Sequence, residues 1–122
     1  MQAIQEKIKS HRTLAEDVEV SMETTPHAIS KEKAEGWLEI GINRLSVGIE
    51  SLSDFELKAM GRDHTRQEAY AGIEAAQQAG YQNICLDLMY GLPEQTLASF
   101  QKTLDEIVEL SRSYNIKHVS AY

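Results

Sequence analysis

Three acidic side chains stand at or near the ends of expected strands, where the ligands of an α/β protein usually bind. Glu23 ends an alternating stretch, Glu50 ends a short β-rich run, and Asp87 lies inside an almost continuously apolar run. Ligands of parallel α/β folds bind at the carboxyl ends of the strands. Carboxylates gathered at such a rim suit a ligand that carries hydroxyl or ammonium groups, or a metal ion. Ser120 and Tyr122 end the last expected strand and belong to the same rim.

Each of these residues also has a plainer interpretation. Glu23 and Glu50 fit equally well as solvent-facing ends of strands. Asp87 is different, because a lone carboxylate in an apolar strand is costly to bury unless it is paired or hydrogen-bonded, and this favours a functional or network role. Arg62 follows Gly61 at the end of a short helix, where spacing alone favours a surface cation over a bidentate holder of a carboxylate.

The elements that must position these residues follow from a hydrophobic pattern that switches between strand and helix periods. Strands are expected at 18–23, 44–49, 84–89 and 117–122, and helices at 2–13, between Ser30 and Gly41, between Ser53 and Gly61, between Thr65 and Gly80, and after Thr96. Strands that alternate with helices predict a parallel sheet with right-handed crossovers. The fold class is therefore α/β.

Local signals support the helices. Ser53 and Thr65 each begin a capping box, with Glu56 and Glu68 expected to reach back to the cap residue. The last helix is expected to present an apolar stripe made of Leu97, Phe100, Leu104 and Ile107. The four strands are too few to close a barrel, which takes about eight strands. We therefore expect a part of a larger fold, whose open sheet edges favour self-association.

Composition narrows the possible functions. The net charge of -7 argues against nucleic-acid and membrane-surface partners. The single cysteine, Cys85, is expected to be a small buried hydrophobe in a reducing, cytoplasmic setting, and it cannot make an internal disulfide or a multi-cysteine metal site. The histidines lack metal-ligand spacing, no phosphate-binding glycine motif occurs, and no segment is apolar enough to span a membrane.

Three stretches resemble the middle of the oxygen-independent coproporphyrinogen III oxidase family of radical S-adenosylmethionine (SAM) enzymes, which includes closely similar haem chaperones and haem-degrading enzymes. They are 41–51 (GINRLSVGIES), 60–65 (MGRDHT) and 87–96 (DLMYGLPEQT). The resemblance implies that residues 1–122 are a single piece of a partial, TIM-like (β/α) barrel. The cluster-binding units that precede this region in the family, and its C-terminal domain, are not in this sequence.

The resemblance also implies site residues, all of them cofactor-binding. Glu23 matches a carboxylate of an E-x-x-P turn that contacts SAM, and Glu50 stands where many members carry Gln near the ribose. Arg62 matches an arginine that pairs with the SAM carboxylate, which reverses the interpretation from spacing alone. Asp87 matches an aspartate that binds cofactor hydroxyls, and Met89 matches an apolar residue packed on adenine. No catalytic or metal-ligating residue is implied.

The implied parent chemistry is oxidative decarboxylation of coproporphyrinogen III to protoporphyrinogen IX in haem biosynthesis, with SAM and a [4Fe–4S] cluster as cofactors. The family holds its cluster in a C-x-x-x-C-x-x-C type motif, which this sequence lacks. The chain alone is therefore expected to be inactive, with the rest of the barrel as its partner. Two alternatives stay open: part of a chaperone that binds and transfers haem, and a non-catalytic half-barrel module.

Overall fold

The protein is a four-stranded parallel sheet with helices packed on one face. The structure, a computed structural model, describes residues 2–122. The strands β1 (Ser21–Thr24), β2 (Arg44–Glu50), β3 (Ile84–Leu88) and β4 (Ile116–Ala121) lie side by side in sequence order, and all three pairings are parallel. The carboxyl ends of all four strands therefore meet at one edge of the sheet, as the sequence predicted.

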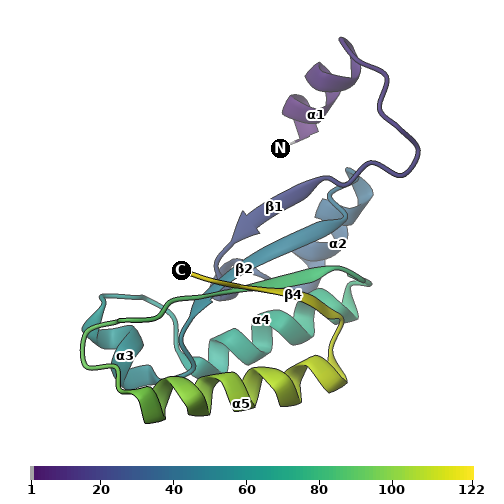
Figure 1. The fold of residues 1–122 in the computed structure, drawn as a ribbon. Helices are drawn as coiled ribbons and strands as arrows, with labels where there is room; N and C mark the ends of the chain where they lie inside the picture. Colours follow the sequence, from purple (N-terminus) through teal and green to yellow (C-terminus); the bar gives the residue numbers. More distant parts are fainter. Residues whose placement is uncertain (1) are drawn as a thin grey trace.

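The connections are helical. They are α2 (Lys31–Glu39) after the short 3-10 helix η1 (Pro26–Ala28), α3 (Asp54–Ala59) and α4 (Arg66–Gln78) between β2 and β3, and α5 (Leu97–Ser113) before β4. Figure 1 shows α4 and α5 running beneath the sheet. The predicted α/β class and order of elements are confirmed, with η1 as the one addition.

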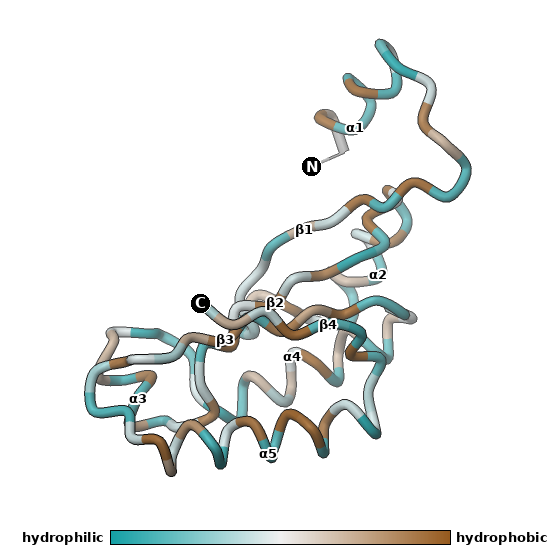
Figure 2. Tube along the Cα trace, viewed as in Figure 1, coloured by the Kyte–Doolittle hydropathy of each residue, from teal (hydrophilic) through white to brown (hydrophobic). Residues whose placement is uncertain are grey.

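The core lies between the sheet and these helices. Alternate residues of a strand point to opposite faces, and one set along β2 and β3 is apolar and wholly buried: Leu45, Val47, Ile49, Ile84, Leu86 and Leu88. These side chains pack against buried residues of α4 and α5. Figure 2 shows the hydrophobic residues along both helices as brown segments. Each such side chain contributes about 1.5–3 kcal/mol by burial. The opposite face of the same strands carries the polar residues of the candidate site.

A close backbone approach fixes α4 against η1. A Cβ atom built on Gly72 would lie 2.7 Å from the Pro26 carbonyl oxygen, which is nearer than atoms tolerate. Pro26 is itself fully buried. Only glycine therefore allows α4 to seat against the turn that follows β1, and this contact sets where the carboxyl end of β1 lies.

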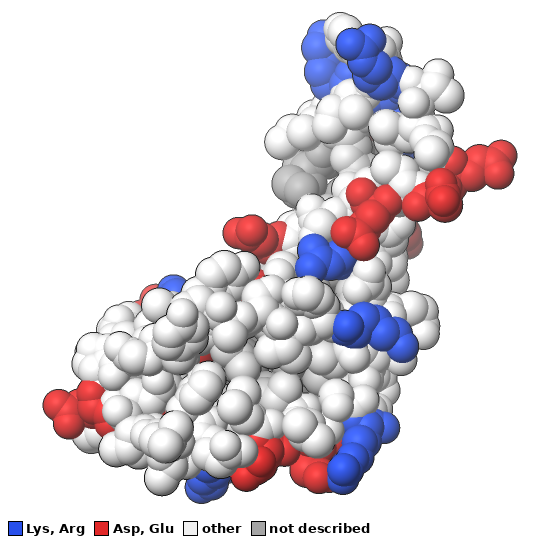
Figure 3. Space-filling model, in the orientation of Figure 1, with Lys and Arg blue, Asp and Glu red and all other residues white. Residues whose placement is uncertain are grey.

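The N-terminal helix α1 (Gln2–Lys9) stands away from this core in Figure 1. Ile4 is 60% and Ile8 47% exposed, so the helix adds no buried apolar face to the sheet. The basic side chains in and just after α1 gather at the top of Figure 3, apart from the acidic side chains lower in the molecule. The helix was expected to extend to residue 13 but ends at Lys9. Just after this end, the side chain of Ser10 donates to the Lys7 carbonyl.

Two other predicted features differ in the structure. The first strand begins at Ser21 rather than at 18, because the Asn43 side chain bonds the Val20 N–H and the Val18 carbonyl in place of a neighbouring strand. Leu97, expected in the apolar stripe of α5, is 85% exposed as the first residue of that helix. Cys85 is fully buried, as predicted.

The capping signals are confirmed except at one residue. Thr65 and Glu68 form the predicted capping box. At Ser53 only half of the box exists: the Ser53 hydroxyl accepts from the Glu56 N–H, but the Glu56 carboxylate does not return to Ser53. It turns instead toward Ser51, Gln95 and Ser99, two of which lie about forty residues further along the chain.

Candidate functional site

An open cavity of about 620 Å³ lies at the carboxyl ends of the strands, on the polar face of the sheet. It is lined by residues of all four strand ends: Glu23, Thr24, Thr25, Ser46, Gly48, Glu50, Asp87, Met89 and Tyr122. Four of the five predicted site residues are therefore brought together, and the fifth, Arg62, reaches the cavity through Glu50. The volume is in the range of small-molecule sites.

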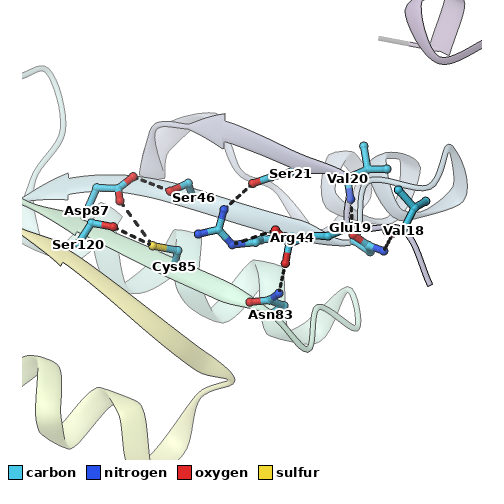
Figure 4. A network of polar contacts seen from close by, with 11 residues as sticks. Val18, Glu19, Val20, Ser21, Arg44, Ser46, Asn83, Cys85, Asp87 and Ser120 are labelled. Atoms are coloured by element: carbon cyan, nitrogen blue, oxygen red, sulfur yellow. Dashed lines mark hydrogen bonds and ion pairs between the residues drawn. The ribbon is translucent and has the colours of Figure 1, made fainter. Parts of the chain in front are cut away.

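Asp87 is the centre of a small polar network on this face. Its carboxylate accepts a hydrogen bond of 2.7 Å from the Ser46 hydroxyl and one of 3.5 Å from the Cys85 thiol, whose sulfur also lies 3.5 Å from the Ser120 hydroxyl (Figure 4). The sequence-based expectation that Asp87 belongs to a network is thus confirmed. The network holds the carboxylate toward the cavity and leaves it with acceptor capacity for a ligand.

Glu50 has an unusual backbone. Its φ of 61° is in the left-handed region, and the β2–β3 register shifts between Gly48 and Glu50. A non-glycine residue in this conformation costs of the order of 1–3 kcal/mol, and such strain is concentrated at functional sites. The Glu50 carbonyl accepts from the Met89 N–H at 2.9 Å, so the bulge on β2 is tied to the residue that follows β3.

Arg62 and Glu50 form an ion pair at the edge of the cavity. The Arg62 guanidinium donates to the Glu50 carboxylate at 2.5 Å, with the arginine side chain 39% and the glutamate side chain 12% exposed. The pair brings a guanidinium to the rim, which spacing in the sequence did not reveal. Part of its donor fork remains available to solvent or to a carboxylate-bearing ligand.

Four residues of the cavity lining were not predicted: Thr24, Thr25, Ser46 and Gly48. Ser46 and Gly48 lie two apart on β2 and so share the polar face with Asp87. A Cβ atom on Gly48 would lie 3.1 Å from a Glu50 carboxylate oxygen and would project into the space between Glu50 and Thr24. The missing side chain therefore keeps the middle of the cavity open. The alternation Ser46-Val47-Gly48-Ile49 was the available signal for Ser46 and Gly48.

The charge of the rim limits its ligands. Three carboxylates, Glu23, Glu50 and Asp87, face one guanidinium, Arg62, which leaves a balance of -2. A cationic ligand with hydroxyl groups fits this balance, whereas a phosphate would be repelled. Among residues 2–122, no group of three or more His, Cys, Asp and Glu side chains is arranged to hold a metal ion.

Glu56 is outside the cavity lining and is 1% exposed. Its carboxylate accepts hydrogen bonds from Ser51 at 2.6 Å, from Ser99 at 2.5 Å and from the Gln95 amide at 3.1 Å. Burial alone would raise the pKa of Glu56, but these three hydrogen bonds outweigh it and hold the pKa below its ordinary value of 4.5. Glu56 is therefore ionised and fully bonded at neutral pH.

This lowered pKa predicts an acid-dependent loss of stability. Because the folded-state pKa is depressed, the contribution of Glu56 is present above pH 4.5 and is lost as the pH falls through the lower folded value. The difference in the free energy of unfolding between the wild type and Glu56→Gln, from urea titrations, should be constant near neutrality and should shrink below pH 4.5. A difference that stays the same down to acid pH would contradict the ionised network.

Comparison with known proteins identifies the superfamily of this chain. The pattern of the Radical SAM superfamily matches residues 1–107. The chain belongs to the Radical SAM superfamily.

Two similar proteins are named as a haem chaperone and as a coproporphyrinogen III oxidase. The "Heme chaperone HemW" of Escherichia coli is 34% identical over 122 residues, which is 100% of this chain and 31% of the relative. The "Oxygen-independent coproporphyrinogen III oxidase" of Cereibacter sphaeroides is 34% identical over 103 residues, 84% of this chain and 23% of the relative. The chain thus spans less than a third of the length of these relatives.

A solved structure gives the same picture. The coproporphyrinogen III oxidase HemN from Escherichia coli, described as a radical SAM enzyme, superposes with a TM-score of 0.79 at 26% identity, covering 97% of this chain and 27% of that one. The predicted resemblance to a part of this barrel is confirmed. Within residues 2–122, no helix combines the length and the apolar character that crossing a membrane requires.

Proposed function

We propose that this chain forms the SAM-binding wall of a radical SAM protein of the coproporphyrinogen oxidase and haem chaperone group. The observation that carries the proposal is the open, acidic cavity at the carboxyl ends of the strands, with one guanidinium at its edge. SAM is a cation that bears a sulfonium and an ammonium group, two ribose hydroxyls and a carboxylate. Each of these groups has a partner of matching chemistry in the cavity.

The residues divide the ligand between them. Asp87 and Glu50 are acceptors for the ribose hydroxyls, and Arg62 is the donor for the carboxylate. Glu23, on β1 and so across β2 from Asp87, is the acidic partner of the cationic groups. Met89 offers a polarisable apolar surface to the adenine ring. In this arrangement the chain binds and orients the cofactor, and SAM supplies the reactive bond when it is bound.

The cluster of the superfamily does not fit this chain. Iron–sulfur clusters are held by several cysteine thiolates, and the only cysteine, Cys85, is fully buried in the sheet. We therefore assign no electron-transfer step to these residues. The chain by itself is proposed to bind the cofactor without turning it over.

Two functions of a longer parent protein are supported by different relatives. Oxidase chemistry on a porphyrinogen is supported by the superposition on the Escherichia coli oxidase. Haem binding and transfer is supported by the relative named as a haem chaperone, whose match extends over the whole chain. Two assays of the full-length protein separate these functions. Saturable stoichiometric binding in a haem titration, followed at the visible absorption band, supports the chaperone. Vinyl formation from coproporphyrinogen III supports the oxidase.

The direct test of the cofactor proposal is a titration of the 122-residue chain with SAM, followed by NMR shifts of the backbone amides. We expect weak, saturable binding that shifts amides of residues 23–25, 46–50 and 87–91. S-adenosylhomocysteine, which lacks the sulfonium charge, should bind more weakly because the rim is acidic. Absence of shifts at these positions would support a half-barrel without a cofactor site.

A further inference from the structure

A buried carboxylate outside the cavity links the turn after β2 to the turn after β3. Both turns adjoin residues that line the cavity. Glu56, on α3, makes no contact with the cavity, yet Ser51, Gln95 and Ser99 all donate to it. Ser51 directly follows Glu50 after β2, while Gln95 and Ser99 come from the turn after β3 and the first turn of α5. One side chain therefore bridges elements about forty residues apart.

The contacts continue from Glu56 to the cavity. On the first side, the Ser51 hydroxyl that donates to Glu56 also accepts from the Ser53 N–H at 3.0 Å, which closes the turn after Glu50. On the second side, Gln95 accepts from the Gly91 N–H at 2.8 Å and donates to the Met89 carbonyl at 3.4 Å. A single residue therefore connects Glu56 to each cavity residue. Ser51 connects it to Glu50, its neighbour in the chain, and Gln95 connects it to Met89 by hydrogen bonds.

Both turns need such support. Glu50 and Glu94 are the two non-glycine residues with positive φ among residues 2–122, at 61° and 63°. Backbone in this region is unfavourable for residues with a Cβ atom and persists only where surrounding contacts determine it. Each of these residues lies next to a partner of Glu56: Glu50 next to Ser51, and Glu94 next to Gln95. The carboxylate is thus bonded beside both unfavourable backbone positions.

We propose that Glu56 is a positioning residue for the adenosine half of the cofactor: through Ser51 and Gln95 it holds Glu50 and Met89 at the distance that the ribose and adenine require. This inference rests on the proposed function. A simple role in stability would accelerate hydrogen exchange throughout the fold, in β3 as well as in the two turns. A positioning role acts on the adenosine half and on the two turns.

Glu56→Ala is the test variant and Glu56→Gln its conservative partner. The glutamine oxygen can accept from Ser51 and Gln95 while its amide donates to the Ser99 hydroxyl, so the bridge keeps its shape without the charge. Ile107→Val, a change in the buried face of α5 far from the bridge, is the control for a general loss of stability.

Two measurements on the 122-residue chain decide the matter. By NMR titration, Glu56→Ala should weaken binding of SAM and of 5′-methylthioadenosine, which lacks the amino-acid group, by the same factor of about ten or more, whereas Glu56→Gln and Ile107→Val should stay within about threefold of the wild type. By hydrogen exchange, Glu56→Ala should accelerate exchange of amides in 50–53 and 89–95 while the amides of 84–88 keep their protection.

The outcomes separate this inference from the proposed function. Equal exchange rates in both turns of Glu56→Ala and wild type, or unchanged affinity for 5′-methylthioadenosine, would overturn the positioning role. A wild-type chain that binds neither ligand would overturn the proposed function and the adenosine role with it. The exchange data would then still show whether Glu56 holds the two turns.

Discussion

Replacing Arg62 with alanine should weaken binding of SAM by about tenfold to a hundredfold and leave binding of 5′-methylthioadenosine nearly unchanged. A hydrogen bond to a charged group contributes about 1.5–3 kcal/mol, which corresponds to that range of affinity. The effect is selective because, among residues 2–122, the guanidinium is the only cation at the cavity rim, and the carboxylate is the only anion of the ligand. Loss of Arg62 also leaves Glu50 unpaired, and its charge then repels the ligand carboxylate.

NMR titration of the two ligands measures this selectivity. Arg62→Lys should recover only part of the affinity, because an ammonium group cannot replace the bidentate fork. Arg66→Ala is the matched control: Arg66 pairs with Glu106 at 2.9 Å on the helical side of the protein and should not affect either ligand. Equal losses for SAM and 5′-methylthioadenosine in Arg62→Ala would mean that Arg62 supports the fold of the rim and does not bind the carboxylate.

The pairing of Arg62 with Glu50 illustrates what the sequence could not predict. The two residues are twelve apart, Glu50 at the end of β2 and Arg62 between α3 and α4, so that no local pattern links them. The resemblance supplied a role for each residue separately, one for the ligand carboxylate and one for the ribose. Their contact follows from the bulge that gives Glu50 a positive φ, and a bulge of one residue leaves little trace in hydrophobic periodicity.

The elements themselves were predictable for a physical reason. The strands alternate or are continuously apolar, and the helices begin at Ser30, Thr65 and Thr96, whose side chains cap them. These are local signals, and they place Glu23, Glu50 and Asp87 at or near the carboxyl ends of neighbouring parallel strands. Convergence of the three carboxylates at one edge then follows from the direction of the strands.

Glu56 shows the limit of local interpretation. Its spacing from Ser53 is that of a capping box, and the serine half of the box does form. The carboxylate nevertheless turns to Ser51, Gln95 and Ser99, because it is buried where α3 meets the turn after β3 and needs several donors there. The choice between the two sets of partners depends on tertiary packing, which the four residues of the box do not encode.

Replacing Asp87 with alanine should weaken SAM and 5′-methylthioadenosine alike, by about tenfold to a hundredfold, since the carboxylate is assigned to ribose hydroxyls that both ligands share. This pattern differs from the selectivity expected of Arg62→Ala, so the two variants together locate the two halves of the ligand. Asp105→Ala, which removes an exposed aspartate of α5, should change neither affinity and controls for net charge.

The stability of Asp87→Ala should change far less than its ligand affinity. The Asp87 carboxylate is half-buried on a polar face, and its donors, Ser46 and Cys85, are side chains rather than backbone groups. Its removal should therefore change the free energy of unfolding in urea by less than about 1 kcal/mol, as expected for a residue kept for binding rather than for folding. A large loss of stability with unchanged affinity would instead make Asp87 a structural residue of the sheet, and the acidic cavity would then need another acceptor for the ribose.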